Sequence, residues 1–192
     1  KILPRRNFNL MLPGVYTATK KDGTIYYRSS ITYQNKHISL GSYASEDTAN
    51  QAYQKADALL RDPSVSFEHA LAHRGVLSFD KTVTLMNFRD NGVYIKTPIY
   101  LRRNYFEYFL SPTLILKFDI DDLFYYSSHR IQKRGGHLFV SDYGMQYNIL
   151  SRYGIKSHGV PGKDFRFVNE DFSDYRYSNI MIINPYAGVN ML

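Results

Sequence analysis

The sequence predicts an α+β fold: an N-terminal three-stranded antiparallel sheet packed on one helix, then a second α+β domain. Short runs rich in aromatic and β-branched residues, separated by the turn sequences KDGT and QNK, predict three strands between residues 14 and 43. Residues 45–60 then place alanine, tyrosine and leucine at helical spacing, which predicts a helix against the sheet. Further strand-like runs beyond residue 92 predict the second domain.

Composition narrows the class of protein. The 192 residues include no cysteine, which excludes disulfides, cysteine-based zinc sites and thiol nucleophiles. No run of apolar residues is long enough to span a membrane, so we expect no membrane partner. The net charge of +7 favours a polyanionic partner, chiefly nucleic acid or an anionic membrane, and of these we expect nucleic acid. The expected location is therefore cytoplasmic and nucleoid-associated.

The chain divides into four predicted segments. Residues 1–12 form a basic arm in which Arg5 and Arg6 are placed to enter a DNA groove. Residues 13–61 form the β-β-β-α unit, whose helix begins at the N-cap Ser45. Residues 62–91 are a connector, with a short helix ending near Gly75 and a strand at residues 79–88. Residues 92–192 form the second domain.

Three elements are predicted within the second domain. Residues 113–126, TLILKFDIDDLFYY, indicate a strand that runs into a short helix with acidic residues at its start. Residues 128–144 indicate a hairpin that turns at Gly135 and Gly136. A last helix is expected at about residues 174–183.

Residues 14–56 read GVYTATKKDGTIYYRSSITYQNKHISLGSYASEDTANQAYQKA. This segment resembles the AP2/ERF family of DNA-binding domains. The Gly-Val opening, the ISLGSY strand and the Ser-Glu-Asp-Thr-Ala helix start match the family pattern in order. The resemblance implies that one face of the sheet lies in the DNA major groove. Because side chains alternate along a strand, the outward and DNA-contacting residues are predicted to be Tyr16, Lys20, Tyr26, Arg28, Ser30, Thr32, His37 and Ser39.

Residues 174–184, DYRYSNIMIIN, resemble the segment that follows the active site in HNH endonucleases, with Asp174, Arg176 and Asn179 in the matching positions. The resemblance implies an HNH-like (ββα) end to the second domain. The family's metal ligand and general-base histidine fall at Arg166 and Phe167, and no histidine stands near residues 148–149, where an earlier one is usual. A cation does not replace a metal ligand and a phenyl ring accepts no proton, so we expect no catalytic residues, metal or cofactor.

The predicted function is therefore that of a non-catalytic, sequence-specific DNA-binding protein, such as a transcriptional regulator of a bacterium or phage. The degenerate HNH-like domain is expected to hold DNA phosphates through Arg152, Lys163, Arg166 and Arg176.

Two alternatives stay open. One is a metal-dependent HNH-type endonuclease with a rearranged site that uses His158 and Asp164. The other is a module that binds a protein or a ligand on the HNH-like framework. His69 and His73 stand four residues apart, but no third metal ligand is evident beside them.

Overall fold

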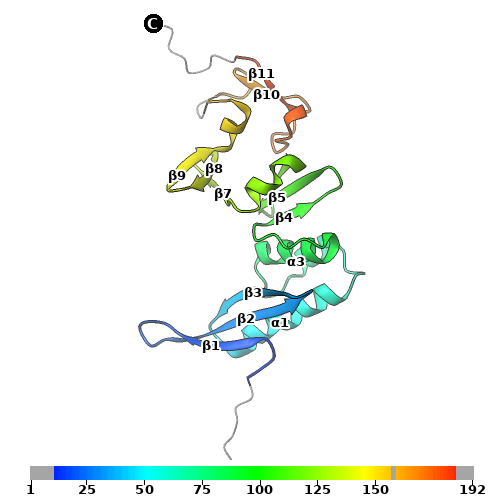
Figure 1. The fold of residues 1–192 in the computed structure, drawn as a ribbon, viewed down its shortest axis with the longest axis vertical. Coiled ribbons are helices and arrows are strands. Elements are labelled where there is room, and N and C mark those ends of the chain that lie inside the picture. Colours follow the sequence, from blue (N-terminus) through cyan, green and yellow to red (C-terminus); the bar gives the residue numbers. More distant parts are fainter. Residues whose placement is uncertain (1–10, 157–158, 185–192) are drawn as a thin grey trace, which may run out of the picture. The chain divides into compact units, whose positions relative to one another are not determined.

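The computed structural model describes residues 11–156 and 159–184, so the predicted arm residues Arg5 and Arg6 lie outside the described part. The chain divides into two compact units, with the boundary between Met86 and Asn87. Each unit contains both helices and strands (Figure 1). The boundary lies within the segment that the sequence marks as a connector.

The first unit has the predicted sheet and helix. Its antiparallel strands stand in the order β1 (Val15–Thr19), β2 (Ile25–Tyr33) and β3 (Lys36–Tyr43), and α1 (Glu46–Arg61) packs on one face. The turn between β2 and β3 is tight because Gln34 and Asn35 take left-handed backbone angles, with φ of 44° and 61°. The predicted β-β-β-α order is confirmed.

Capping and small side chains explain why α1 forms at this place. The Ser45 hydroxyl accepts a hydrogen bond from the Thr48 amide at 3.2 Å, which satisfies one of the unpaired N–H groups of the first turn. Along the helix, Ala49, Ala52 and Ala56 are fully buried. Their small size lets the helix axis lie close to the sheet, whose inner face supplies the apolar core residues Val15, Ile31, Ile38 and Leu40.

The connector is more helical than the sequence suggests. The predicted short helix is present as α2 (Phe67–Ala72), but residues 79–88, predicted as a strand, belong to α3 (Phe79–Asn91). The β-branched residues Thr82 and Thr84 that favour a strand instead donate their hydroxyls to the carbonyls of Ser78 and Asp80, each at 3.0 Å. Residues 82–88 are all buried, so the helix has no polar face and no helical period to recognise.

The second unit is built from three small antiparallel sheets. Their strands, in chain order, are β4 (Ile99–Leu101), β5 (Tyr105–Ser111) and β6 (Leu114–Asp119), then β7 (Ile131–Arg134), β8 (His137–Asp142) and β9 (Met145–Asn148), and last β10 (Phe165–Phe167) and β11 (Ile180–Ile182). Short helical turns join them, namely η1 (Ile120–Asp122), α4 (Leu123–Tyr126), η2 (Ile149–Tyr153) and η3 (Tyr177–Asn179). The strand running into a short helix at residues 114–126 and the hairpin with a Gly135-Gly136 turn are both confirmed.

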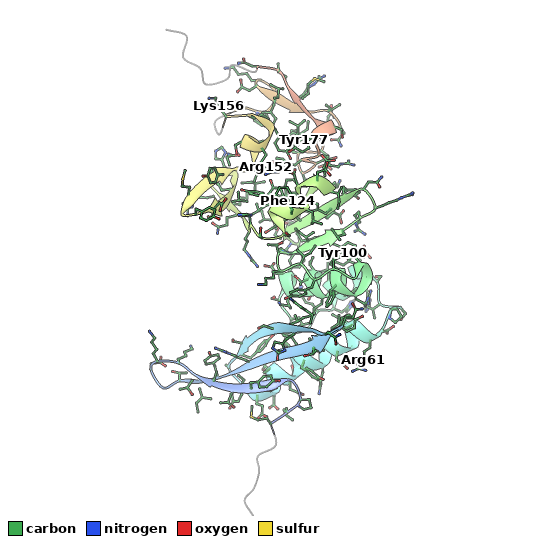
Figure 2. The ribbon with its side chains drawn as sticks, viewed as in Figure 1. Arg61, Tyr100, Phe124, Arg152, Lys156 and Tyr177 are labelled. Atoms are coloured by element: carbon green, nitrogen blue, oxygen red, sulfur yellow. The ribbon has the colours of Figure 1, made fainter. Side chains whose placement is uncertain are left out.

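Aromatic side chains fill the interior of the second unit. The Phe118 and Tyr126 rings stack with their centres 4.3 Å apart, in a cluster that joins the β4–β6 and β7–β9 sheets. A smaller cluster contains Phe165 and Phe167, and Tyr175 packs against both clusters. Arg152, which is labelled in Figure 2, forms an ion pair with the buried carboxylate of Asp122 in the same unit.

The prediction of a last helix at about residues 174–183 is wrong. Within the described residues, the segment from Asp174 to Ile182 contains a single turn, η3, and then strand β11, which pairs with β10. The expected ββα end is therefore a strand pair closed by a loop. Across the described residues, none of the helices is both long and apolar enough for a membrane crossing.

Gly14 provides a test of the first unit. Its φ is +72°, and a Cβ at this position would lie 2.1 Å from Cδ2 of Tyr53. We expect Gly14→Ala to lower the free energy of unfolding by more than about 2 kcal/mol, because it adds a steric clash to backbone strain. Urea unfolding followed by circular dichroism measures this change.

Gly23→Ala is the matched control, since Gly23 has φ of +86° but open space around its Cβ position. That variant carries only the backbone strain and should lose about 1 kcal/mol. Equal losses in the two variants would contradict the assigned contact with Tyr53.

Candidate functional site

The outer face of the first sheet, opposite α1, collects most of the residues predicted to touch DNA. Strand pairing sets Tyr16 across from Arg28, Ala18 across from Tyr26, and Thr32 across from His37. Directly paired residues share a face, so these side chains form one surface. We call it the outer sheet face; its predicted members are Tyr16, Lys20, Tyr26, Arg28, Ser30, Thr32, His37 and Ser39.

Ser30 belongs to this face by pairing and is largely buried. It stands across from Ser39, at an irregularity in the ladder between Ser29 and Ser30, and its amide donates to the Gly14 carbonyl at 3.0 Å. Its short side chain on the central strand is only 8% exposed. Ser30 lines a pocket of about 290 Å³ together with Tyr16, Thr32 and His37, and its contact with DNA stays a prediction.

Arg28 and Tyr26 form a prearranged pair on the outer sheet face. The Nη2 of Arg28 donates to the Tyr26 hydroxyl at 2.8 Å, and its guanidinium carbon lies 5.5 Å from the centre of the Tyr26 ring. Arg28 is nevertheless exposed to solvent. A guanidinium held in one orientation but still open loses less side-chain entropy on binding than a free one.

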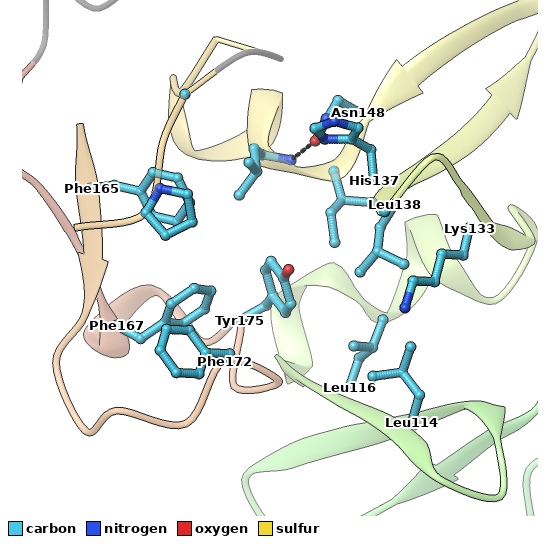
Figure 3. A pocket seen from close by; sticks show the side chains of 15 residues that line it. Leu114, Leu116, Lys133, His137, Leu138, Asn148, Phe165, Phe167, Phe172 and Tyr175 are labelled. Carbon is cyan, nitrogen blue, oxygen red and sulfur yellow. Dashed lines mark hydrogen bonds between the residues drawn. The ribbon is translucent and has the colours of Figure 1, made fainter. Parts of the chain in front are cut away.

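In the second unit, the structure brings together positions that the HNH resemblance singles out. Asn148 and Ile149, at the junction of β9 and η2, and Phe167, on β10, line a single pocket of about 360 Å³ (Figure 3). Arg166 points the other way, because it lies between the buried Phe165 and Phe167 and is itself exposed.

The chemistry of this pocket does not suit metal-assisted hydrolysis. Most of its lining is leucine, phenylalanine and tyrosine, and the charged member is Lys133. Among residues 11–156 and 159–184, no three histidine, aspartate or glutamate side chains gather in a way that could hold a metal ion. The predicted DNA-cutting alternative relies on His158, which is outside the described residues.

Asp164, the second residue of that alternative, has a structural role. One carboxylate oxygen accepts the Val160 amide at 2.8 Å and the other accepts the Asn184 side-chain amide at 3.3 Å. In the first unit, the ring of His69 on α2 stacks on the ring of His73, the residue that caps this helix, with the ring centres 4.2 Å apart. Neither arrangement supplies a metal site among the described residues.

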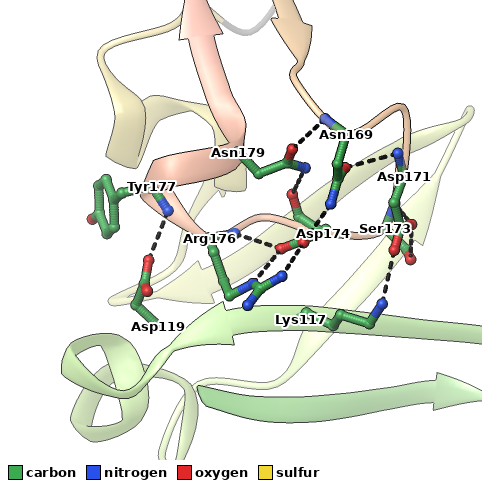
Figure 4. A network of polar contacts seen from close by, with 9 residues as sticks. All are labelled: Lys117, Asp119, Asn169, Asp171, Ser173, Asp174, Arg176, Tyr177 and Asn179. Atoms are coloured by element: carbon green, nitrogen blue, oxygen red, sulfur yellow. Dashed lines mark hydrogen bonds and ion pairs between the residues drawn. The ribbon is translucent and has the colours of Figure 1, made fainter. Parts of the chain in front are cut away.

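The Asp174 segment, which resembles the HNH motif, serves to hold a loop in place (Figure 4). Asp174 is completely buried, and its carboxylate accepts hydrogen bonds from Nε and Nη2 of Arg176 at 2.8 and 2.6 Å. Asn169 donates to the same carboxylate at 2.9 Å, and Asn179 donates to the Asp174 carbonyl at 2.8 Å. Burial raises the pKa of Asp174, but the hydrogen bonds from Arg176 and Asn169 lower it by more.

This network also attaches the loop to strand β6. The Lys117 amide donates to the Ser173 carbonyl at 2.9 Å, and the Tyr175 amide donates to the Lys117 carbonyl at 2.8 Å. The ammonium of Lys117 pairs with Asp171 at 2.8 Å. These bonds hold the backbone extended beside β6, which explains why residues 174–183 do not form the predicted helix.

Two of the four cations predicted to hold phosphates in this unit already have carboxylate partners. Arg176 is paired with Asp174, and Arg152 is paired with the buried Asp122 while it stacks 4.5 Å from the centre of the Tyr125 ring. The two aspartates offset the charges of these arginines, so a phosphate would have to compete with the carboxylates for the guanidinium groups. Lys163 and Arg166 are exposed, so they are better placed than Arg152 and Arg176 for the predicted contact with DNA phosphates.

Comparison with known proteins identifies no relative of this chain. Scans against family models, curated proteins and solved structures each returned no match for this chain.

The Lys117–Asp171 pair predicts how stability depends on pH. The hydrogen bonds from Lys117 and Ser173 lower the pKa of Asp171 from 3.8 to about 2. A lowered folded-state pKa gives stability that is complete above the unfolded value and is lost as the pH falls toward the folded value. We expect Asp171→Asn to flatten part of the decline in unfolding free energy between about pH 4 and pH 2.

Urea unfolding curves at half-unit pH steps measure this slope. Lys117→Gln removes the main partner and should flatten the same interval. A slope in Asp171→Asn identical to that of the unmodified protein would show that this ion pair does not contribute.

Proposed function

We propose that this protein binds double-stranded DNA in a sequence-specific way and does not cut it, as a transcriptional regulator or a similar DNA-binding factor does. The outer sheet face of the first unit is the proposed reading surface. The observation that carries the proposal is the exposed, oriented Arg28 at the centre of a polar sheet face whose opposite side is covered by α1.

The dimensions of the sheet suit a major groove. Three strands with a spacing of about 4.8 Å place the outer two about 10 Å apart. B-form DNA has a major groove about 12 Å wide, in which arginine pairs with guanine O6 and N7. Arg28, on the central strand, would face the groove floor. His37, on the outer strand β3, and Lys20, which follows β1 at the turn to β2, would lie nearer the phosphates.

Charge on the outer sheet face agrees with a polyanionic partner. Its described members include the cations Lys20 and Arg28 and no aspartate or glutamate. Tyr16 is 57% exposed beside Arg28 and adds an aromatic surface that can contact sugar or a thymine methyl group. The second unit would add sequence-independent backbone contacts through Lys163 and Arg166.

Selection from a pool of random duplexes, with Mg²⁺ present, tests this proposal. We expect enrichment of a defined motif and intact strands when the same DNA is run on a denaturing gel. Cut strands would favour the endonuclease alternative. Binding that hardly changes between 50 and 200 mM salt would also contradict the proposal, because phosphate contacts release counterions.

Arg28→Ala tests the proposed reading residue. On the selected site we expect its affinity to fall about tenfold to a hundredfold, as for the loss of one bidentate base contact. Affinity for unrelated duplex should fall much less. Fluorescence anisotropy titrations with both duplexes measure the difference.

Arg103→Ala is the matched control, because Arg103 is also exposed but belongs to the β4–β5 loop of the second unit. It removes the same charge away from the proposed reading surface. If both variants lose affinity equally on both duplexes, net charge alone explains the binding and Arg28 does not read sequence.

A further inference from the structure

The pocket at the HNH-like positions of the second unit has the properties of a small-molecule site. Its volume of about 360 Å³ falls at the low end of the range for ligand pockets. Leu114 and Leu116 of β6 form one wall, and Phe165 and Phe167 form the wall across from them (Figure 3). Such a space favours an apolar body about the size of one aromatic ring with a short chain.

The aromatic wall of the pocket is ordered by its own contacts. The Phe167 ring lies 5.7 Å from Phe165, 5.5 Å from Phe172 and 5.4 Å from Tyr175, in each case edge to face. Tyr175 is held by its backbone bond to Lys117. Because these rings already have fixed orientations, a ligand would meet a preformed surface, and only Phe172, which is 69% exposed, stands at its rim.

Lys133 gives the pocket a charge. Alternation along β7 puts Lys133 on the same side of the sheet as the buried Ile131, and pairing sets it across from the buried Leu138. Figure 3 shows its ammonium beside Leu138 and Leu116. Among the described residues that line the pocket, none is an aspartate or a glutamate, so its lining offers this cation no carboxylate.

We propose that this pocket binds a small carboxylate with an aromatic or branched apolar body, and that Lys133 is its counter-ion. The apolar body would displace water from the leucine and phenylalanine walls. Lys133 is exposed, so its ammonium is accessible to the carboxylate and would form a charge-assisted hydrogen bond with it. The proposal concerns the second unit and does not depend on whether the first unit binds DNA.

Isothermal titration calorimetry of the full chain with 3-phenylpropionate tests the proposal, and 3-phenylpropionamide is its uncharged counterpart. We expect the carboxylate to bind with a Kd below about 1 mM, the weak end of specific affinity. The amide should bind at least tenfold more weakly. Absence of heat for the carboxylate at 10 mM ligand, or equal affinities for the two compounds, would overturn the proposal.

Lys133→Gln removes the charge and keeps most of the apolar stem, while Arg134→Gln is the matched control. Arg134 is the next residue on the same strand, is exposed and faces the opposite side of the sheet. We expect Lys133→Gln to weaken carboxylate binding by about tenfold. Arg134→Gln should leave it unchanged.

Filling the pocket gives an independent readout. Leu114 is only half-buried, so Leu114→Trp can occupy the cavity with little disturbance to the core. Its circular dichroism spectrum reports the fold, and carboxylate binding should be lost while the fold is kept. Equal weakening in both strand β7 variants, or full binding in a folded Leu114→Trp, would place the ligand elsewhere and contradict this site.

Discussion

The second unit depends on the need to satisfy one buried carboxylate. Asp174 is removed from water, and an unpaired charge there would cost several kcal/mol. Arg176 and Asn169 meet this need from the same loop, and Asn179 ties down the adjoining carbonyl. The loop is therefore fixed beside β6, and this in turn sets Phe167 and Tyr175 against the rest of the core.

The same physical rule separates five cations of this unit into two groups. Arg152 and Arg176 each stand against a buried aspartate and serve the fold. Lys163, Arg166 and Lys133 are exposed, and Lys133 stands across from the buried Leu138 on strand β8. Net charge alone treats all five as equivalent, whereas their local surroundings give them different chemistry.

Sequence reasoning recovers the first unit well because its signals are local. Turn residues, two-residue alternation and the Ser45 cap all act within a few positions, and the sheet and α1 follow. It fails for α3, whose middle is buried on all sides and so has no polar face to reveal a helical period. At the candidate site, alternation predicts the outer sheet face, but not the burial of Ser30 on the central strand. The ion pair of Arg152 joins it to Asp122, which is 30 residues away in the chain, and no local sequence pattern predicts such a pair.

The position of the boundary between the units has a consequence for domain exchange. Met86 and Asn87 lie inside α3, so a fusion joint placed there would break the i to i−4 hydrogen bonds that cross it. It would also uncover the buried side chains of residues 82–88. A graft of the N-terminal sheet onto another protein should therefore carry the entire helix, through Asn91, as part of the transplanted module.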